Sequence, residues 1–281
     1  MIKHIAVALD GSAHACAAEQ LAIALADLVH GMVHGIHVVD ATFLEGAFIT
    51  NISGAMGFEP FLNLQSQMRV TLDEVADVIR RDFTEHCAAS GVEGRFHLER
   101  AGVAHGILAA SKLADLLVVG QRGVNARFHE DLLGATTETL LRRSQIPVLI
   151  VPRQGAMPKR PLVAYDGSPK AVRALQQAAQ LARALDLSLT VVTVDPTEEH
   201  ARARLAEAAS YLEPYDARVE YQAESGEAIE ERLLALLGEG RHDLVFLGAH
   251  GHGRIVELVL GSTSQFLARR SSVPVWCVTR V

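Results

Sequence analysis

The sequence contains an internal repeat, and this repeat constrains the fold more than any other feature. Three short segments of the first half return in the same order in the second half. A chain that repeats itself from end to end in this way is predicted to hold two copies of one domain. The matching pairs are Val7–Ser12 with Val163–Ser168, Ala114–Gly120 with His242–Gly248, and Ser144–Val151 with Ser271–Val278.

The spacing of the repeat places the domain boundaries and an insertion. The offset between the copies falls from 156 at the first pair to 128 at the second, so the first copy holds 28 additional residues there. We place this insertion at about residues 41–64, which contain four of the nine phenylalanines. A connection that packs on its own domain is the favoured interpretation, and a lid or partner-binding arm is the alternative. The two domains are residues 1–152 and 160–281, joined by a segment rich in proline.

Apolar runs alternate with helical patterns in each half, which predicts βαβ units and a parallel sheet. We therefore expect an α/β fold with two doubly wound, five-stranded parallel sheets. The expected strands are Ile5–Leu9, Ile36–Val39, Phe96–Glu99, Leu116–Val119 and Val148–Val151, then Leu162–Tyr165, Leu189–Val194, Val219–Ala223, Leu244–Leu247 and Val275–Val278. The expected first-half helices are Ala13–Val29, Met68–Ala89, Ala104–Leu113 and Thr137–Arg143.

Composition and charge argue against several classes of function. With 49% apolar residues the chain can bury a core, and its net charge of −7 with no Lys/Arg-rich run argues against nucleic acid as a partner. The sequence contains no uninterrupted run of about 18 apolar residues, so no membrane span is predicted. The amino-terminal segment is too short to read as a signal peptide, so we expect a soluble cytoplasmic protein. The cysteines form no C-x-x-C pair and are expected to be small buried hydrophobes.

The motif that points most directly to chemistry lies late in the second half. Gly248 follows an apolar strand, Gly251 comes three residues later, and Gly261 is followed by Ser262 and Thr263 where a helix is expected to begin. Glycines at a strand end let the backbone approach phosphate oxygens closely. The N–H groups and dipole at the helix start attract the anion, and the hydroxyls add donors. The alternative is a glycine-bearing turn that only connects strand to helix.

Asp166 ends the first strand of the second half and is followed by Gly167 and Ser168. Because ligands of parallel sheets bind at the carboxyl ends of the strands, Asp166 is expected to face the same crevice as the glycine motif. Its carboxylate can accept hydrogen bonds from a ribose or an adenine amino group. Capping of the next helix by Asp166 is the structural alternative, and the two roles are compatible.

Together these motifs resemble the universal stress protein family in its tandem form, whose ATP-binding members carry G-x2-G-x9-G-S/T after the fourth strand. The resemblance implies a Rossmann-like fold of the adenine nucleotide alpha hydrolase type. It also implies antiparallel pairing of Val148–Val151 with Val275–Val278. It implies ATP as the ligand, commonly with Mg²⁺. The residues assigned to this site by the resemblance are Asp166 at the adenine, the backbone of Thr193 at the base, Gly248 near the ribose, and Gly251, Gly261, Ser262 and Thr263 at the phosphates. His250, in the loop after Gly248, is added as a residue near a phosphate.

The first half departs from this family pattern. Ten residues rather than nine separate Gly123 from Gly134, and Ala135 then replaces the expected hydroxyl residue. An additional loop residue moves the amides that would meet phosphates, so we expect weaker binding or none in this half. The positions that still match are Asp10, Val38, Gly120, Gly123, Gly134 and Thr136.

Three functional interpretations remain open from the sequence. An ATP-binding regulatory protein is favoured, because the motif offers amides and hydroxyls but no lysine to neutralise a γ-phosphate and no acid placed to orient water. A slow ATPase or phosphotransferase is the second, and a scaffold that binds no nucleotide is the third. His250 and His252 form an H-x-H, but a loop role is favoured over a metal site. The two domains are expected to pair within one chain, and a homodimer is a further option.

Overall fold

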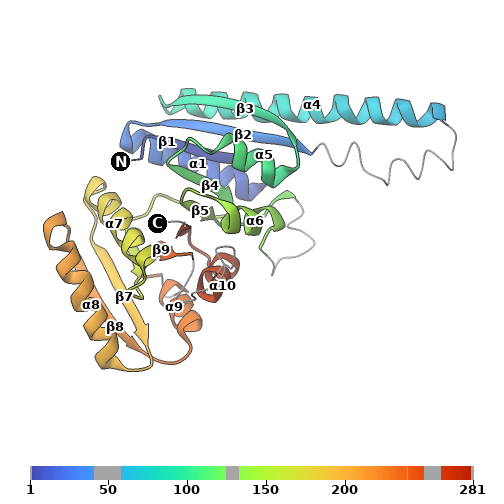
Figure 1. Ribbon diagram of the computed structural model, residues 1–281. Helices are drawn as coiled ribbons and strands as arrows, with labels where there is room; N and C mark the ends of the chain where they lie inside the picture. The colour runs from blue at the N-terminus through green and yellow to red at the C-terminus, as the bar shows by residue number, and fades with distance from the viewer. Residues whose placement is uncertain (1, 41–57, 125–132, 239, 250–260, 280–281) are drawn as a thin grey trace.

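The computed structural model describes residues 2–40, 58–124, 133–238, 240–249 and 261–279. Ten strands form one sheet in the order β3-β2-β1-β4-β5-β10-β9-β6-β7-β8 (Figure 1). Within the described residues no helix is both long and apolar enough to span a bilayer. The first half comprises β1 (His4–Leu9), α1 (Ala13–Val29), β2 (Met32–Asp40), α4 (Phe58–Ala89), β3 (Glu93–Ala101), α5 (Val103–Ala110), β4 (Leu116–Gly120), α6 (Ala135–Arg143) and β5 (Val148–Val151).

The second half repeats this arrangement and confirms the predicted fold class. All neighbours within each half are parallel, and each half has the strand order 3-2-1-4-5 of a doubly wound sheet. Its elements are β6 (Pro161–Ala164), α7 (Pro169–Ala184), β7 (Leu189–Asp195), α8 (Glu198–Leu212), the 3₁₀ turn η2 (Glu213–Tyr215), β8 (Val219–Ser225), α9 (Ile229–Gly238), β9 (Leu244–Gly248), α10 (Ser262–Arg270) and β10 (Val275–Val278).

Two apolar layers cover the two faces of the sheet. One layer is built on α1, α4, α7 and α8, and includes Leu21, Phe83 and Leu175. The other is built on α5, α6, α9 and α10, and includes Leu140 and Leu267. Because both layers continue from one half into the other, the chain has a single sandwich of helices around one sheet.

Several first-half elements are longer than the sequence predicts, including β3, which runs over Glu93–Ala101 rather than Phe96–Glu99. Helix α4 begins at Phe58 rather than Met68, so the end of the expected insertion is helical, and α4 extends beyond the sheet in Figure 1. The remainder of the insertion, 41–57, lies outside the described residues. Strand β2 runs over Met32–Asp40 rather than Ile36–Val39. Its polar and glycine residues interrupt the apolar pattern, but pairing with β1 and β3 on both sides holds them in the sheet.

The halves meet where β5 pairs antiparallel with β10, in the register Val275 with Ile150 and Cys277 with Val148. Every residue of both strands is buried. Trp276 packs its ring on Phe246 with centroids 4.9 Å apart, and its Nε1 donates to Gln177 Oε1 at 2.8 Å. This pairing therefore unites two five-stranded sheets through strands whose side chains are apolar on both faces.

A glycine at the end of the fourth strand of each half lets the first helix pack closely. A Cβ on Gly248 would lie 2.9 Å from Lys170 Cβ and 3.0 Å from the Ala171 nitrogen. A Cβ on Gly120 would lie 2.9 Å from the His14 carbonyl carbon. Because these contacts include backbone atoms, neither position has room for a side chain while the helix stays in place.

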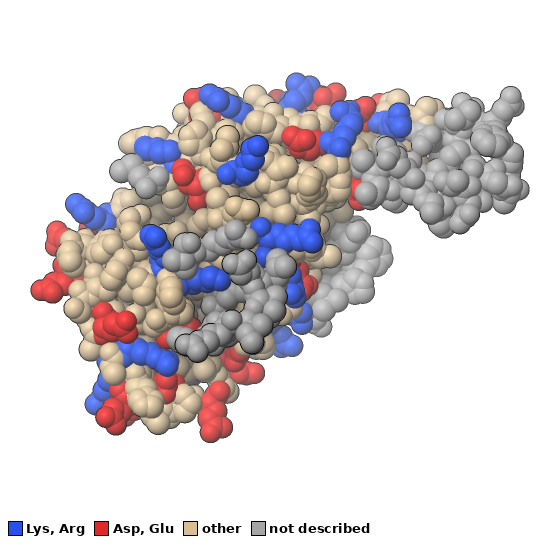
Figure 2. Space-filling model, in the orientation of Figure 1, with Lys and Arg blue, Asp and Glu red and all other residues tan. Residues whose placement is uncertain are grey.

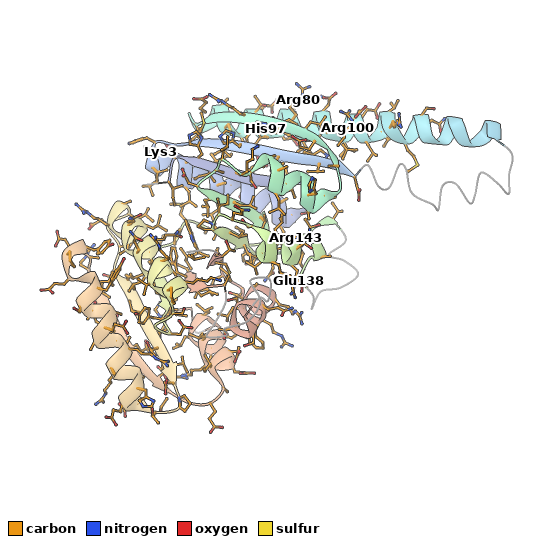
Figure 3. The ribbon with its side chains drawn as sticks, viewed as in Figure 1. Lys3, Arg80, His97, Arg100, Glu138 and Arg143 are labelled. Atoms are coloured by element: carbon orange, nitrogen blue, oxygen red, sulfur yellow. The ribbon has the colours of Figure 1, made fainter. Side chains whose placement is uncertain are left out.

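Three histidines form a row across β1, β2 and β3 near the start of β1, with His97 labelled in Figure 3. His34 lies in the middle, with 3.2 Å between its ring nitrogens and those of His4 and His97. Neighbouring rings stack with centroids 5.5 and 5.4 Å apart. Burial lowers the pKa of His34, and positive charge on His97, His4 or Arg95 lowers it further. The neutral form of the middle ring, His34, is therefore favoured.

The glycine contact predicts that Gly248→Ala destabilises the protein. The added Cβ must displace the first turn of α7, and such overpacking costs about 1–3 kcal/mol. Denaturant unfolding measures the change. Gly238→Ala at the end of α9 is the matched control, because its Cβ would meet nothing within 4 Å; that variant should equal or slightly exceed wild-type stability. Equal stability of the two variants would contradict the close-packing account.

The histidine row predicts that the protein becomes less stable as the pH is lowered. The pKa of His34 is lower in the folded state than in the unfolded chain, so protonation favours unfolding. The free energy of unfolding should fall as the pH drops through about 6.5, by less than about 1.4 kcal/mol per pH unit for this one group. His34→Asn should flatten this slope in denaturant titrations. His105→Asn, which removes an exposed histidine of α5, should leave it unchanged. An unaltered slope in His34→Asn would refute the assignment.

Candidate functional site

The Asp-Gly-Ser segment of each half forms the turn between the first strand and the first helix. Asp166 Oδ1 accepts from the Ser168 nitrogen at 2.9 Å, and Gly167 has φ +78°. Ser168 Oγ accepts from the Ala171 nitrogen at 3.2 Å, so Ser168 is the helix cap, and the structural alternative in which Asp166 caps the helix is wrong. Asp10, Gly11, Ser12 and Ala15 repeat these contacts in the first half, at 2.9 Å, φ +76° and 3.2 Å.

The sheet brings this turn to the edge that holds the glycine motif. Strands β6 and β9 are neighbours, with Val163 opposite Phe246, so Asp166 and Gly248 follow at the same carboxyl edge. In the first half the aspartate and the loop that holds the glycine motif are in direct contact. The Val124 nitrogen donates to Asp10 Oδ2 at 3.2 Å, and a Cβ on Gly123 would lie 2.7 Å from the same oxygen. The aspartate and the glycine motif therefore belong to one site region in each half.

The third glycine of the motif closes the loop at the helix start. The Gly261 nitrogen donates to the Ala249 carbonyl at 3.0 Å, and Ser264 Oγ donates to the Gly248 carbonyl at 2.9 Å. In the first half Gly134 donates to Gln121 at 3.1 Å, and Thr137 Oγ1 donates to Gly120 at 2.9 Å. Sequence reasoning missed Ser264 and Thr137. A hydroxyl three residues after the third glycine of both copies was the available signal.

Both hydroxyls at the start of α10 point to one carboxylate that the sequence analysis did not select. Ser262 Oγ donates to Glu230 Oε1 at 2.8 Å, and Thr263 Oγ1 lies 3.2 Å from the same oxygen. The bond from Ser262 lowers the pKa of Glu230, and Thr263 adds to this effect. In the first half α6 begins with Ala135, so this pair of hydroxyls is reduced to Thr136. Glu230 and the two hydroxyls form a cluster of oxygen ligands at the helix start.

The strand register corrects one correspondence between the halves. Leu9 lies opposite His37, and continuing the β6–β7 register places Tyr165 opposite Thr193. The side chains agree with this alignment, because His37 Nδ1 donates to the Leu9 carbonyl at 2.7 Å and Thr193 Oγ1 donates to the Tyr165 carbonyl at 2.9 Å. Thr193 is therefore the counterpart of His37, and the counterpart of Val38 is Val194. The sequence analysis had assigned Val38 and Thr193 to the same role.

The second-half site differs electrostatically from the first. Tyr165 replaces Leu9 beneath the site, and burial, with the charges of Glu207 and Asp166, raises the pKa of Tyr165 to about 12. Asp195, at the end of β7, lies 3.0 Å from Arg204. Hydrogen bonds from Thr197 hold the pKa of Asp195 below its usual range, and the positive charge of the nearby Arg204 lowers it further. The rim of the site therefore carries an ionised acid that is already paired.

Two predicted site residues and the H-x-H motif lie outside the described part of the chain, because His250, Gly251 and His252 fall within 250–260. Among the described residues no group of three His, Cys, Asp or Glu side chains is arranged to hold a metal ion. The described members of the second-half prediction are Asp166, Thr193, Gly248, Gly261, Ser262 and Thr263.

Comparison with known proteins places the chain in a family. The model for the universal stress protein family matches residues 1–152, 157–235 and 197–279. Universal stress protein Slr1230 of Synechocystis sp. is 30% identical over 285 residues, 98% of this chain and 99% of its own length. A universal stress protein of Mycolicibacterium smegmatis is 34% identical over 209 residues, 67% of this chain and 69% of its own length.

Solved structures show the same fold. The crystal structure of a universal stress protein from Archaeoglobus fulgidus matches with a TM-score of 0.74 at 22% identity, over 99% of this chain and 96% of that one. A putative universal stress protein from Pseudomonas aeruginosa matches with a TM-score of 0.61 at 15% identity, over 99% and 93%. Family matches to both halves and a relative of nearly full length agree, and the chain belongs to the universal stress protein family.

Proposed function

We propose that this protein binds ATP in its second half and acts as a nucleotide-responsive regulatory protein. The observation that supports this most strongly is the meeting of Asp166, Gly248 and the start of α10 at one carboxyl edge of the sheet. Parallel sheets of this kind bind ligands where the strand order reverses, between the first and fourth strands. In the second half these strands are β6 and β9.

Each part of an adenine nucleotide has a matching group at this edge. The Asp166 carboxylate accepts hydrogen bonds from the adenine amino group or ribose hydroxyls. The strand register favours the backbone of Val194, rather than that of Thr193, as the part of β7 that meets the base. Helix α10 begins at Ser262 and Thr263, and the backbone N–H groups of its first turn are available to donate to an anion.

The position of Glu230 means that a cation must accompany phosphate at this site. A carboxylate beside the helix start repels phosphate unless a cation lies between them. Glu230, Ser262 and Thr263 supply oxygen atoms only, which are the ligands that Mg²⁺ prefers. We therefore assign these three residues to the Mg²⁺ that accompanies the nucleotide. The ion would neutralise phosphate charge there, while the chain's own groups bind and orient the nucleotide.

The first half is proposed to bind nucleotide more weakly. Asp10 Oδ2 already accepts from the Val124 nitrogen, so a ribose or base must displace part of the loop. Ala135 provides no hydroxyl where the second half has Ser262. One additional residue also separates the second and third glycines. These differences leave the second half as the principal site.

Binding is favoured over hydrolysis by the state of the nearest described acid. A general base needs a pKa near the working pH, whereas hydrogen bonds lower the pKa of Glu230 further below it. Glu230 is therefore suited to hold a cation and poorly suited to accept a proton from water. This supports a regulatory role in which occupancy changes the conformation or partners of the chain.

Calorimetric titration of nucleotide-stripped protein with Mg-ATP tests the proposal. We expect one strong site per chain, which Gly261→Val abolishes because a branched side chain obstructs the amides at the start of α10. Gly134→Val is the matched control at the equivalent position of α6, and it should keep that site. Absence of heat and of thermal stabilisation at millimolar ATP would exclude ATP as the ligand. Loss in Gly134→Val alone would move the principal site to the first half.

Glu230→Gln tests the role assigned to magnesium. Without the carboxylate, affinity for Mg-ATP should fall about tenfold, as for loss of one charged ligand worth ~1.5 kcal/mol. Affinity for ATP in the presence of a chelator should hold or rise, because a repulsive charge has been removed. Glu231→Gln, an exposed neighbour on α9, should behave as wild type in both titrations. An unchanged ratio of the two affinities in Glu230→Gln would refute this role.

A further inference from the structure

A cavity of about 370 Å³ lies where the two halves meet, apart from the residues assigned to either nucleotide site. Its walls come from the start of α1, the loop after β4, the linker after β5 and the turn between α10 and β10. We call it the seam cavity. The lining residues that carry the argument are His14, Gln121, Arg122, Arg153, Arg269 and Arg270.

The seam cavity concentrates positive charge in a protein whose net charge is −7. Four of its described lining residues are arginines, and none of the described lining residues is an acid. Burial lowers the pKa of His14, and the charges of Arg122 and Arg153 lower it further. On the face shown in Figure 2, Lys and Arg side chains also lie along the middle of the molecule, between the two halves. The lining of this cavity is complementary to an anion.

One polar atom in the wall is buried without a partner. Arg269 Nε is inaccessible to solvent and makes no hydrogen bond among the described residues. Leaving a charged donor unsatisfied is costly, and such groups are usually paired in native proteins. Gln121, which also lines the cavity, does have partners: its Nε2 donates to the carbonyls of Ala268 and Ser271 at 2.9 and 3.0 Å. The loop of the first half is thus tied to the wall that the second half supplies.

The sister repeat carries the same two basic residues at its helix end but pairs one of them with an acid: Arg142 and Arg143 end α6, as Arg269 and Arg270 end α10. Arg142 on α6 corresponds to Arg269 on α10, and Arg142 pairs with Glu138 at 2.8 Å. The residue four positions before Arg269 is Gln265, which is uncharged. Ala249 likewise occupies the position of Gln121 in the other half, so it cannot make that bridge. The cavity therefore differs from the sister repeat in two ways: Arg269 has no acid four positions earlier on its own helix, and Gln121 bridges the two halves.

We propose that the seam cavity binds the di- or triphosphate group of a small molecule, at a site separate from the two nucleotide sites. Arginine forks bind phosphate oxygens bidentately, and several of them neutralise a group with three or four negative charges. The volume falls in the range of small-molecule sites. The cavity residues contact phosphates rather than a base, so inorganic polyphosphate and a nucleotide tail share the required chemistry.

Calorimetric titration of the full chain with inorganic tripolyphosphate in magnesium-free buffer tests the proposal. Arg153→Gln/Arg270→Gln removes two exposed cavity guanidiniums and should weaken binding at least tenfold. Arg80→Gln/Arg95→Gln removes the same charge from exposed arginines of α4 and β3, and should bind as wild type. Near-UV circular dichroism checks that each variant is folded. Adenosine, which carries no phosphate, should not bind the cavity.

A further variant separates this site from the second-half nucleotide site. Gly261→Val alters the start of α10 and replaces no cavity residue, so tripolyphosphate binding should persist in it. Gly134 is kept, because a Cβ there would lie 3.4 Å from the Gln121 carbonyl oxygen of the cavity wall. ATP binding that persists in Gly261→Val and is lost on adding Arg153→Gln/Arg270→Gln identifies a nucleotide tail as a ligand of the cavity, whereas loss of ATP with retained tripolyphosphate identifies free polyphosphate. The seam site is refuted if tripolyphosphate does not bind, if both arginine pairs weaken it equally, or if the glycine variant abolishes it.

Discussion

The antiparallel pairing of β5 with β10 is the interaction on which the remainder of the structure depends. All eight residues of these strands are buried, so either half alone would expose an apolar edge. Because the pairing is antiparallel, the carboxyl edges of the two halves face opposite directions. The loop after β4 in one half therefore lies beside the helix–strand turn of the other, and Gln121 bonds to Ala268 and Ser271 for this reason.

Duplication separates what the fold requires from what a ligand requires. The Asp-Gly-Ser turns, the tight glycines at the ends of β4 and β9, and the hydroxyls of Thr137 and Ser264 occur in both halves with nearly the same distances. These features build the site region of both halves, so they do not decide which half binds nucleotide more tightly. The differences are more informative: Ser262 against Ala135, and the cluster on Glu230. They occur in the half whose glycine spacing fits the family pattern.

The repeat, the fold class and most elements could be predicted from the sequence, because the strands of a parallel sheet buried on both faces are continuous apolar runs. Sequence reasoning failed where a long-range contact decides the outcome. The extent of β2 depends on its two neighbours. The match of Val38 to Thr193 was avoidable, because the offset of 156 at the first repeat pair already places Val194 opposite Val38, and the pairing of Leu9 with His37 agrees with it. Glu230 is distant in sequence from Ser262 and belongs to no motif. Its position follows from the packing of α9 beside α10.

The seam cavity carries a cost that the fold alone does not explain. Guanidinium groups that share a cavity repel one another, so the anion proposed for the seam cavity would stabilise it by neutralising their charge. A ligand that binds only the folded pair stabilises it by mass action. Gln121 and Arg122 lie between Gly120 and Gly123, within the loop of the first-half site. Occupancy of the cavity and of that site must therefore be energetically coupled through one loop, in favour or in opposition, and reciprocally.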